Sequence, residues 1–339
     1  MIELSICIPT YNRANMLKEA LNSIIISAKG FEESIEIIIL DNASSDNTKD
    51  VAQEFLSGYG FIKYLCHEKT IGGNLNIYEA AKKGTAEYIW IFSDDDKIIP
   101  ETIKTVLGLI DSGYNLIKYN SSVWTQDFSS CLKASYLPYK KDSVFKSHNE
   151  LMKKFSLHLG FISSVVFKRD VYFSISSEEY IKFIEYGFPH LYAIYSGLIN
   201  NCTAYFVSKP LIEQRGLNSE YKTLQWYKYF AEGSTLIFNE LNKKGYTITS
   251  IINAKNLVLK DYIMHDISFR RRQNMDISGV FKILYDNFKG FLFFWVVCVP
   301  ELVAPRFLVW IANKIVVVAR KFRSCLIRSN NKMIRKISE

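Results

Sequence analysis

An α/β fold with a mostly parallel, doubly wound sheet and a helical C-terminal region is predicted by three observations. Strand-like apolar runs alternate with segments of helical periodicity over residues 4–92. Polar clusters follow three of these strand-like runs at the point where each run ends. Beyond residue 221 the sequence changes to long helical segments that become strongly apolar and then basic. Together these features indicate a ligand-binding sheet followed by a helical appendage.

The elements of the sheet follow from their local patterns. Short apolar runs that end at turn residues are typical of buried strands, and four of them are present, at 4–11, 35–40, 61–67 and 87–92. Helical spacing of apolar residues occupies the segments between them, at 15–26, 45–57 and 72–84. Ser45 or Asp46 is expected to cap the second helix, and Gly84 is expected to end the third in a left-handed conformation. Repeated strand, helix, strand predicts parallel pairing.

Polar clusters lie at the ends of the first, second and fourth predicted strands. They are "PTYNR" (9–13), "DNASSDN" (41–47) and "SDDD" (93–96). In doubly wound sheets ligands bind in the crevice at the carboxyl ends of the strands, so these clusters are expected to converge on one site. The first two clusters are also ordinary turn and helix-capping sequences, and a purely structural role is the alternative for each.

The third cluster is the most informative, because three adjacent carboxylates, Asp94, Asp95 and Asp96, repel one another. Mg²⁺ and Mn²⁺ prefer oxygen ligands and commonly bind through one or two carboxylates together with substrate phosphates. A divalent cation would offset both the repulsion and the charge of a diphosphate. No P-loop or dinucleotide fingerprint is present, so a nucleoside diphosphate is expected to bind through Mg²⁺ or Mn²⁺.

Composition and charge restrict the class of protein further. The chain has 339 residues, 48% of them hydrophobic, and a net charge of +8. From Pro300 to Glu339 nine basic residues face two acidic ones, a net of +7, so the rest of the chain carries only +1. A nearly neutral body with a basic tail favours a local electrostatic anchor and no nucleic-acid partner. Six widely spaced cysteines and an N-terminus without a signal-like apolar region predict a reducing compartment.

Four motifs in order carry a resemblance to a known family. The segments "SICIPTYNRANMLKEALNSI", "IIILDNASSDNT" and "GGNLNIYEAAKKGTAEYIWIFSDDD", with a proline four residues later, resemble the nucleotide-sugar domain of family 2 glycosyltransferases. This resemblance implies the GT-A fold and covers residues 1–105 densely, extending loosely to about residue 216. The later segments "FISSVVFKRDVY" and "FPHLY…FVSKPLIEQRG" resemble bacterial sugar transferases of O-antigen and lipopolysaccharide synthesis, the abequosyltransferase-like group.

The resemblance implies roles for individual positions. The acid matching Asp41 contacts the nucleotide base, Tyr11 offers a stacking face, and Arg13 contacts the diphosphate or base. The nucleotide pocket is then expected to include Pro9, Thr10, Tyr11, Arg13, Asp41, Asn42, Gly73, Asn74 and Asp94. Asp95 is expected to be the direct metal ligand, with Asp96 extending the motif. The activity implied is a metal-dependent, inverting transfer of a sugar from a nucleoside-diphosphate sugar to a polyprenyl-linked glycan.

The residue expected to act as general base, which accepts the proton of the acceptor hydroxyl, departs from the family pattern. Relatives carry an acidic pair some twenty residues before the "PL" found here at 210–211, and the corresponding positions here are Pro189 and His190. Two candidates follow, His190, which can accept a proton near neutral pH, and Glu185, which is close in sequence. A packed histidine without a catalytic role is the alternative for His190. A nucleotidyltransferase-type enzyme and a non-catalytic, membrane-bound sugar-binding protein are the alternative functions.

The sequence of the C-terminal region predicts that this region contacts a membrane without crossing it. We expect a glycosyltransferase domain at 1–221, with a nucleotide-binding half at 1–105 and an acceptor half at 106–221, and a helical region at 222–339. The longest charge-free stretch in the apolar part, 290–300, is too short for the roughly 20 residues that span a bilayer. An interfacial helical pair whose basic tail meets an anionic membrane surface is predicted, peripheral to the cytoplasmic face of the inner membrane. A buried helix packed on the catalytic domain is the alternative.

Overall fold

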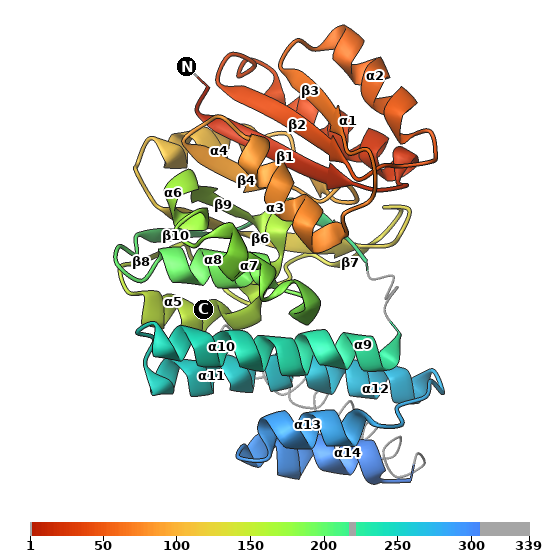
Figure 1. The fold of residues 1–339 in the computed structure, drawn as a ribbon, viewed down its shortest axis with the longest axis vertical. Helices are drawn as coiled ribbons and strands as arrows, with labels where there is room; N and C mark the ends of the chain where they lie inside the picture. Colours follow the sequence, from red (N-terminus) through yellow and green to blue (C-terminus); the bar gives the residue numbers. More distant parts are fainter. Residues whose placement is uncertain (1, 217–221, 306–339) are drawn as a thin grey trace, which may run out of the picture. The chain divides into compact units, whose positions relative to one another are not determined.

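The computed structural model describes residues 2–216 and 222–305. Residue contacts divide the chain into two compact units, Met1–Val258 and Leu259–Glu339. The boundary expected from composition, after residue 221, lies within the first unit, because α9 (Thr223–Tyr227), η4 (Lys228–Gly233), α10 (Ser234–Lys243) and α11 (Ile248–Val258) belong to it. Figure 1 shows α10 and α11 lying side by side.

The N-terminal half of the sheet is parallel, as the alternating pattern predicts. Its strands are β1 (Leu4–Thr10), β2 (Ile35–Asp41), β3 (Ile62–Cys66) and β4 (Tyr88–Ile91), and they are arranged in the order β3-β2-β1-β4. Strand β1 pairs in parallel with β2 on one side and β4 on the other. The carboxyl ends of β1, β2 and β4 therefore lie at one edge, which Figure 1 shows in red and orange.

The expectation of a mostly parallel sheet is wrong for the second half. The order continues β4-β9-β6-β10-β5, where β9 (Val165–Lys168) is antiparallel to both β4 and β6 (Leu116–Trp124). Strand β10 (Ala204–Arg215) is parallel to β6 and antiparallel to β5 (Lys97–Ile98) and β8 (Ser143–Phe145), and β7 (Cys131–Lys133) is antiparallel to β6. Parallel neighbours need long crossovers, and the connection from β6 to β7 is too short for one. The sheet is therefore mixed.

The first half of the sheet is packed on both faces. Alternate residues of β1, namely Leu4, Ile6 and Ile8, belong to a buried cluster that includes residues of α1 (Ala14–Ala28) and α4 (Thr102–Ile110). Helix α3 (Gly73–Lys83) also contacts β1, and the residue that follows this helix approaches Ser5, which lies between the clustered positions. Burial on both faces explains why β1 and β2 are continuously apolar in sequence.

Two helix-end predictions need correction. Gly84 follows α3 with φ −59°, so it is not left-handed, and glycine is required there for space. A Cβ at Gly84 would lie 2.6 Å from Cδ1 of Ile89 and 2.9 Å from Cβ of Ser5. Helix α2 (Thr48–Gly58) begins after Asn47, and the Asp46 carboxylate accepts hydrogen bonds from the Thr48 backbone N–H and hydroxyl. Asp46 thus stabilises the first turn, although it lies one residue before the cap.

The remainder of the first unit consists of short helices that follow or precede β9. They are α5 (His148–Phe155), η1 (Ser156–Gly160), η2 (Ile162–Ser164), α6 (Arg169–Tyr172), α7 (Ser177–Ile181), η3 (Ile184–Tyr186) and α8 (Pro189–Gly197). Most aromatic residues of this segment are core, since Phe155, Tyr180, Tyr192 and Tyr195 are buried.

The second unit is helical where the structure describes it. Its elements are η5 (Leu259–Ile263), α12 (Met264–Arg272), α13 (Val280–Phe288), η6 (Phe294–Cys298) and α14 (Val299–Val303). Within the described ranges, no helix combines the length and apolar character needed to cross a bilayer. The basic residues Arg306 to Lys336, on which the predicted electrostatic contact depends, lie outside the described residues.

Candidate functional site

The first and third polar clusters meet at the carboxyl edge of the sheet. Strand β1 lies beside β4, so Thr10 at its end reaches the aspartates after β4. The Thr10 hydroxyl donates a 2.7 Å hydrogen bond to Oδ2 of Asp94. The guanidinium of Arg13 contacts Oδ1 of Asp94 at 3.0 Å and Oδ2 of Asp95 at 3.3 Å. Two segments more than eighty residues apart thus form one charged cluster.

The three aspartates have different surroundings. Asp94 is 3% exposed, and its burial raises its pKa to about 6 despite the attraction of Arg13. Burial, together with the charge of Asp95, raises the pKa of Asp96 well above its usual range. Asp95 is the most accessible, with 29% of its side chain exposed, and the Ser93 hydroxyl donates to its Oδ1 at 2.5 Å. Burial therefore disfavours the charged forms of Asp94 and Asp96, and Asp95 is the carboxylate of the cluster that a ligand can reach most easily.

Asp96 is held by residues that come from later parts of the chain. The Ser163 hydroxyl donates to its Oδ2 at 2.6 Å, and the backbone N–H of Arg215 donates to its Oδ1 at 3.1 Å. The side chain of Arg215 is 7% exposed, and it donates from Nε to the carbonyl oxygen of Asp95 and pairs with Glu19. Helix η2 and the end of β10 thereby fix the orientation of the acid cluster.

A cavity of about 240 Å³ adjoins this cluster. It includes four of the predicted site residues, Arg13, Asp95, Asp96 and His190. Its other lining residues are Met16, Ile77, Ser93, Gln126, Gly160, Phe161, Ile162, Gln214, Arg215 and Gly216. Two carboxylates, two guanidinium groups and one imidazole therefore share a single concave surface, as expected of a site for a polar, charged ligand.

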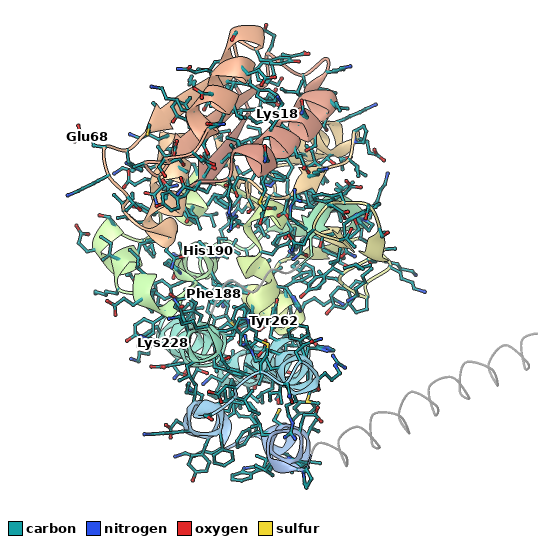
Figure 2. All side chains as sticks on the ribbon, turned by 90° about the vertical axis from the view of Figure 1, so that its right-hand side faces the viewer. Lys18, Glu68, Phe188, His190, Lys228 and Tyr262 are labelled. Carbon is teal, nitrogen blue, oxygen red and sulfur yellow. The ribbon has the colours of Figure 1, made fainter. Side chains whose placement is uncertain are left out.

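His190 is buried in this cavity wall, and Figure 2 shows it next to Phe188 at the start of α8. Its Nε2 lies 2.9 Å from the carbonyl oxygen of Gly160. A carbonyl oxygen can only accept, so Nε2 carries the hydrogen and Nδ1 keeps a free lone pair. Nδ1 has no hydrogen-bond partner among the described residues. Burial lowers the pKa of His190 to about 4, which keeps the imidazole neutral at pH 7.

The second polar cluster does not line this cavity, but hydrogen bonds connect its Ser44 and Ser45 to Asn12 of the first cluster, as the predicted convergence requires. Asp41 is buried, and its carboxylate accepts from the Ser44 backbone N–H at 2.8 Å and from the Tyr64 hydroxyl at 2.7 Å. Asn42 accepts from the backbone N–H of Ile71 at 2.8 Å. These bonds hold the loops after β2 and β3 together. Pro9 is half-buried beside Thr10, and Tyr11 is 47% exposed on the turn after β1.

The turn before α3 connects to the segment that carries Glu185. Gly72 has a φ of +84°, which favours glycine, and Gly73 begins the helix. The Asn74 amide donates to the carbonyl oxygen of Ile184 at 2.8 Å. Glu185 itself is exposed on η3 and is not among the residues that line the cavity. Of the two base candidates, the structure brings only His190 to the acid cluster.

Sequence reasoning missed several residues of the site, and three of them are polar side chains near the aspartates. Ser163, Gln126 and Gln214 reach it from η2, the loop after β6 and the end of β10. None of them stands in a motif, and only the pairing of β9, β6 and β10 brings them beside residues 93–96. Nothing in a single sequence marks such contacts.

The sequence predicts a divalent cation at the acid cluster, and the side chains there meet this prediction in part. Among the described residues, no group of three or more His, Cys, Asp or Glu side chains is arranged to hold a metal. Two carboxylates, Asp95 and Asp96, face the cavity together, and two carboxylates plus phosphate oxygens are an ordinary Mg²⁺ set. The residues therefore fit a divalent cation that a diphosphate helps to coordinate.

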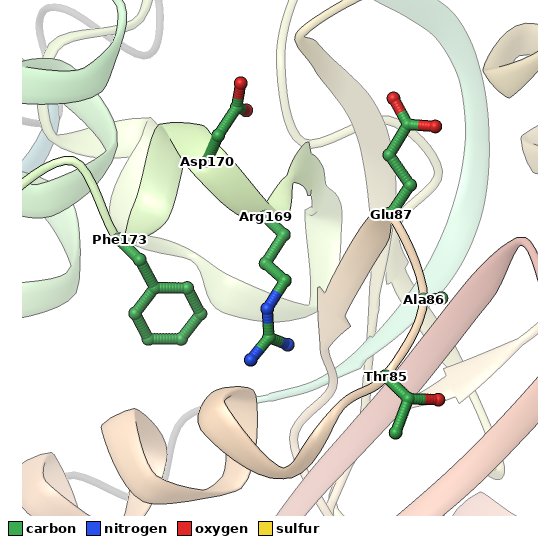
Figure 3. Close-up of a pocket in the computed structure, with 6 residues that line it drawn as sticks. All are labelled: Thr85, Ala86, Glu87, Arg169, Asp170 and Phe173. Carbon is green, nitrogen blue, oxygen red and sulfur yellow. The ribbon is translucent and has the colours of Figure 1, made fainter.

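A larger cavity, of about 470 Å³, lies at the opposite end of β4 (Figure 3). It is lined by Thr85, Ala86, Glu87, Arg169, Asp170 and Phe173. Arg169 donates to the carbonyl oxygens of Gly84 and Lys82 at the end of α3. Its guanidinium therefore satisfies a helix terminus, and the cavity lacks the convergence of acids and imidazole seen at the carboxyl edge.

The fold and the site together define a GT-A-like protein. Solved structures agree with this class. TarS from Staphylococcus aureus in complex with UDP-GlcNAc superposes with a TM-score of 0.57 at 14% identity, covering 89% of this chain and 78% of that one. A mannosyltransferase from Pyrobaculum calidifontis in complex with GDP-Man and Mn²⁺ gives a TM-score of 0.50 at 13% identity, covering 76% and 69%. At these identities the likeness establishes the fold.

The family follows from the sequence comparison. Residues 5–173 match the model of the glycosyl transferase family 2 domain, so the chain belongs to this family of enzymes, and the resemblance is confirmed. Abequosyltransferase RfbV of Salmonella typhimurium is 27% identical over 65% of this chain and 68% of its own length. A Campylobacter jejuni enzyme, GalNAc(5)-diNAcBac-PP-undecaprenol beta-1,3-glucosyltransferase, is 29% identical over 46% of this chain and half its own length. Homologues therefore act in surface-glycan synthesis.

Proposed function

We propose that this glycosyltransferase moves a sugar from a nucleoside-diphosphate sugar to a polyprenyl-linked glycan in the synthesis of O-antigen or a similar bacterial surface polysaccharide. The observation that carries the proposal is the shared cavity of Asp95, Asp96, Arg13 and His190. An acceptor linked to a lipid diphosphate is suggested by the name of the Campylobacter relative. TarS and the mannosyltransferase, which share the fold, bind nucleotide-sugar donors.

Each of these residues can then have a separate role in the reaction. Arg13 lies at the mouth of the acid cluster, where a guanidinium can bind diphosphate oxygens in a bidentate manner. His190 lines this cavity and its Nδ1 keeps a lone pair without a partner among the described residues, so it can accept the proton of an acceptor hydroxyl. Asp95 and Asp96 would hold a divalent cation, which when bound stabilises the negative charge of the departing diphosphate. Attack opposite the leaving group gives inversion at the anomeric carbon.

Metal-dependent nucleotide binding tests the proposal directly. We expect UDP, GDP, CDP or dTDP to raise Tm only when Mn²⁺ or Mg²⁺ is present, because the acid cluster repels a diphosphate without a cation. The measurement is a thermal-shift titration of each nucleotide with and without Mn²⁺. Equal stabilisation in EDTA would contradict metal dependence, and no stabilisation by any nucleotide diphosphate would contradict the proposed function.

Peripheral attachment to the cytoplasmic face of the inner membrane is part of the proposal. The second unit exposes large apolar side chains, with Leu292 at 77%, Val296 at 62%, Val303 at 66% and Trp295 at 44%. Aromatic and aliphatic side chains of this kind partition into the headgroup boundary, and the sequence adds a basic segment after them.

Vesicle binding should follow from these features. The full chain is expected to sediment with vesicles that contain anionic lipid, and the bound fraction should fall as salt is raised, because screening weakens the basic contribution. Trp295→Ser should weaken binding further, since an exposed indole contributes apolar area, while Leu224→Ser, at an exposed site in the first unit, serves as the control. A chain that stays in the supernatant with anionic vesicles at low salt would contradict attachment.

A further inference from the structure

Two residues that line the cavity beside the acid cluster each carry a buried polar atom that lacks a hydrogen-bond partner among the described residues. These atoms are Nδ1 of His190 and Oε1 of Gln214, and both are shielded from solvent. Both residues line the same cavity of about 240 Å³. A buried acceptor without a partner is unfavourable, so native structures rarely keep one without a reason.

Both atoms can only accept hydrogen bonds. Gln214 presents its amide oxygen, and His190 presents a lone pair because its Nε2–H is used on the Gly160 carbonyl oxygen. A ligand that satisfies them must therefore bring donors. The same cavity contains the apolar surfaces of Ile77, Phe161 and Ile162. Hydroxyl groups on a ring with apolar C–H faces, as in a sugar, match both properties.

The backbone holds Gln214 firmly in this position. It lies near the end of β10, paired with Val123 of β6. The next residue, Arg215, donates its backbone N–H to Asp96 and its Nε–H to the carbonyl oxygen of Asp95. The backbone of Gln214 is therefore fixed relative to the aspartates, and a side chain carried by a rigid strand discriminates between substrates better than one carried by a mobile loop.

We propose that Oε1 of Gln214 accepts a hydrogen bond from a hydroxyl group of a sugar substrate, which makes Gln214 a specificity-determining residue. The inference rests on the proposed function and deepens it. A site built to bind a hydroxyl rejects an analogue that lacks the hydroxyl, because the acceptor is then left without a partner. The hydroxyl belongs either to the sugar of the donor or to the terminal sugar of the acceptor.

The test replaces Gln214 by methionine, which has similar length and lacks the acceptor. Calorimetry in the presence of Mn²⁺ gives the Kd of each nucleoside diphosphate and of the matching glucose and N-acetylglucosamine conjugates. If the hydroxyl is on the donor, Gln214→Met weakens binding of the conjugate by roughly 3- to 10-fold, the size of one hydrogen bond, and leaves the Kd of the free diphosphate unchanged. Gln53→Met, at an exposed position of α2, is the control.

A second measurement, of transfer kinetics, distinguishes a hydroxyl of the donor sugar from a hydroxyl of the acceptor sugar. If the hydroxyl is on the acceptor, donor affinities stay unchanged in Gln214→Met, and kcat/KM for transfer to undecaprenyl-diphosphate-linked N-acetylglucosamine falls by a similar factor. In either case Tm without nucleotide should match or exceed that of the parent, because the mutation removes an unsatisfied buried acceptor.

Two results would overturn the role of Gln214. One is a variant with parental Kd values and parental transfer, and the other is a variant whose Tm falls by several degrees, which would indicate a structural role. A parent protein that binds no nucleoside diphosphate and no conjugate would refute the proposed function itself, and the inference with it. The failure of Gln214 alone is thus distinguishable from failure of the proposed activity.

Discussion

Replacing Asp95 by asparagine is expected to lower kcat/KM for sugar transfer by about 10²- to 10³-fold, the usual cost of losing one charge-stabilising group at a reaction centre. Asp95 is the most accessible carboxylate of the cluster and faces the cavity. Asparagine keeps the shape of the side chain and an oxygen for the Ser93 hydroxyl, but it lacks the charge that attracts a divalent cation. Transfer should be measured at saturating Mn²⁺ and across a Mn²⁺ titration.

The variant should remain folded, which separates a functional effect from a structural one. Asp95 raises the pKa of both Asp94 and Asp96, so its charge is unfavourable to its neighbours. We therefore expect Tm without added metal to be equal to or higher than that of the parent. Asp50→Asn, at an exposed position of α2, is the matched control for loss of one carboxylate and should leave activity unchanged. Parental activity in Asp95→Asn at all Mn²⁺ concentrations would remove Asp95 from the metal site.

Replacing His190 by glutamine is expected to lower kcat by about 10²- to 10⁴-fold while leaving nucleotide affinity unchanged. Glutamine can still donate to the Gly160 carbonyl oxygen, but it offers no basic nitrogen. The buried imidazole has a pKa of about 4, so the acidic limb of kcat/KM should lie near pH 4 in the parent and not near the ordinary value of about 6.5. Steady-state kinetics from pH 4 to 8 checks both statements, and equal kcat in the variant would exclude His190 as the base.

The same histidine should make the parent protein sensitive to acid. Its pKa is lower in the folded than in the unfolded state, so the unfolded chain binds the proton first as pH falls. Stability is then full above pH 6.5 and is lost towards pH 4, by about 2 kcal/mol between pH 7.5 and pH 5. Urea unfolding at these two pH values should show a smaller loss in His190→Gln. An identical loss in both proteins would place the acid sensitivity elsewhere.

The N-terminal half of the fold could be predicted from sequence because it follows simple periods. Buried parallel strands are continuously apolar, and helices of period 3.6 separate them, so β1 to β4 and their order along the chain were found. The second half has two- and three-residue strands such as β5, β7 and β8, which are too short to show a period. Their antiparallel pairing therefore had no signal in the sequence.

The residues of the site also fall into those that the sequence could predict and those that it could not. Thr10, Arg13 and Asp94 were predicted to converge because parallel strands bring their carboxyl ends to one edge, and hydrogen bonds now connect them. His190 was chosen by its spacing from residues 210–211, and its proximity to the acid cluster depends on packing that one sequence does not reveal. Gln214 could not be predicted as a site residue, because an amide side chain in a strand belongs to no motif. Only the lack of a hydrogen-bond partner for its Oε1 among the described residues distinguishes it.

The ion pairs of Arg13 have a consequence for how substrates enter. Its guanidinium already serves as the counterion of Asp94 and Asp95. A cation arriving alone would compete with Arg13 for these two carboxylates, and a diphosphate arriving alone would compete with the carboxylates for Arg13. When both arrive together, every charge simply exchanges one partner for another. Cation and diphosphate should therefore enhance each other's binding reciprocally. Because Arg13 couples the two, the site should be occupied mainly by both ligands together.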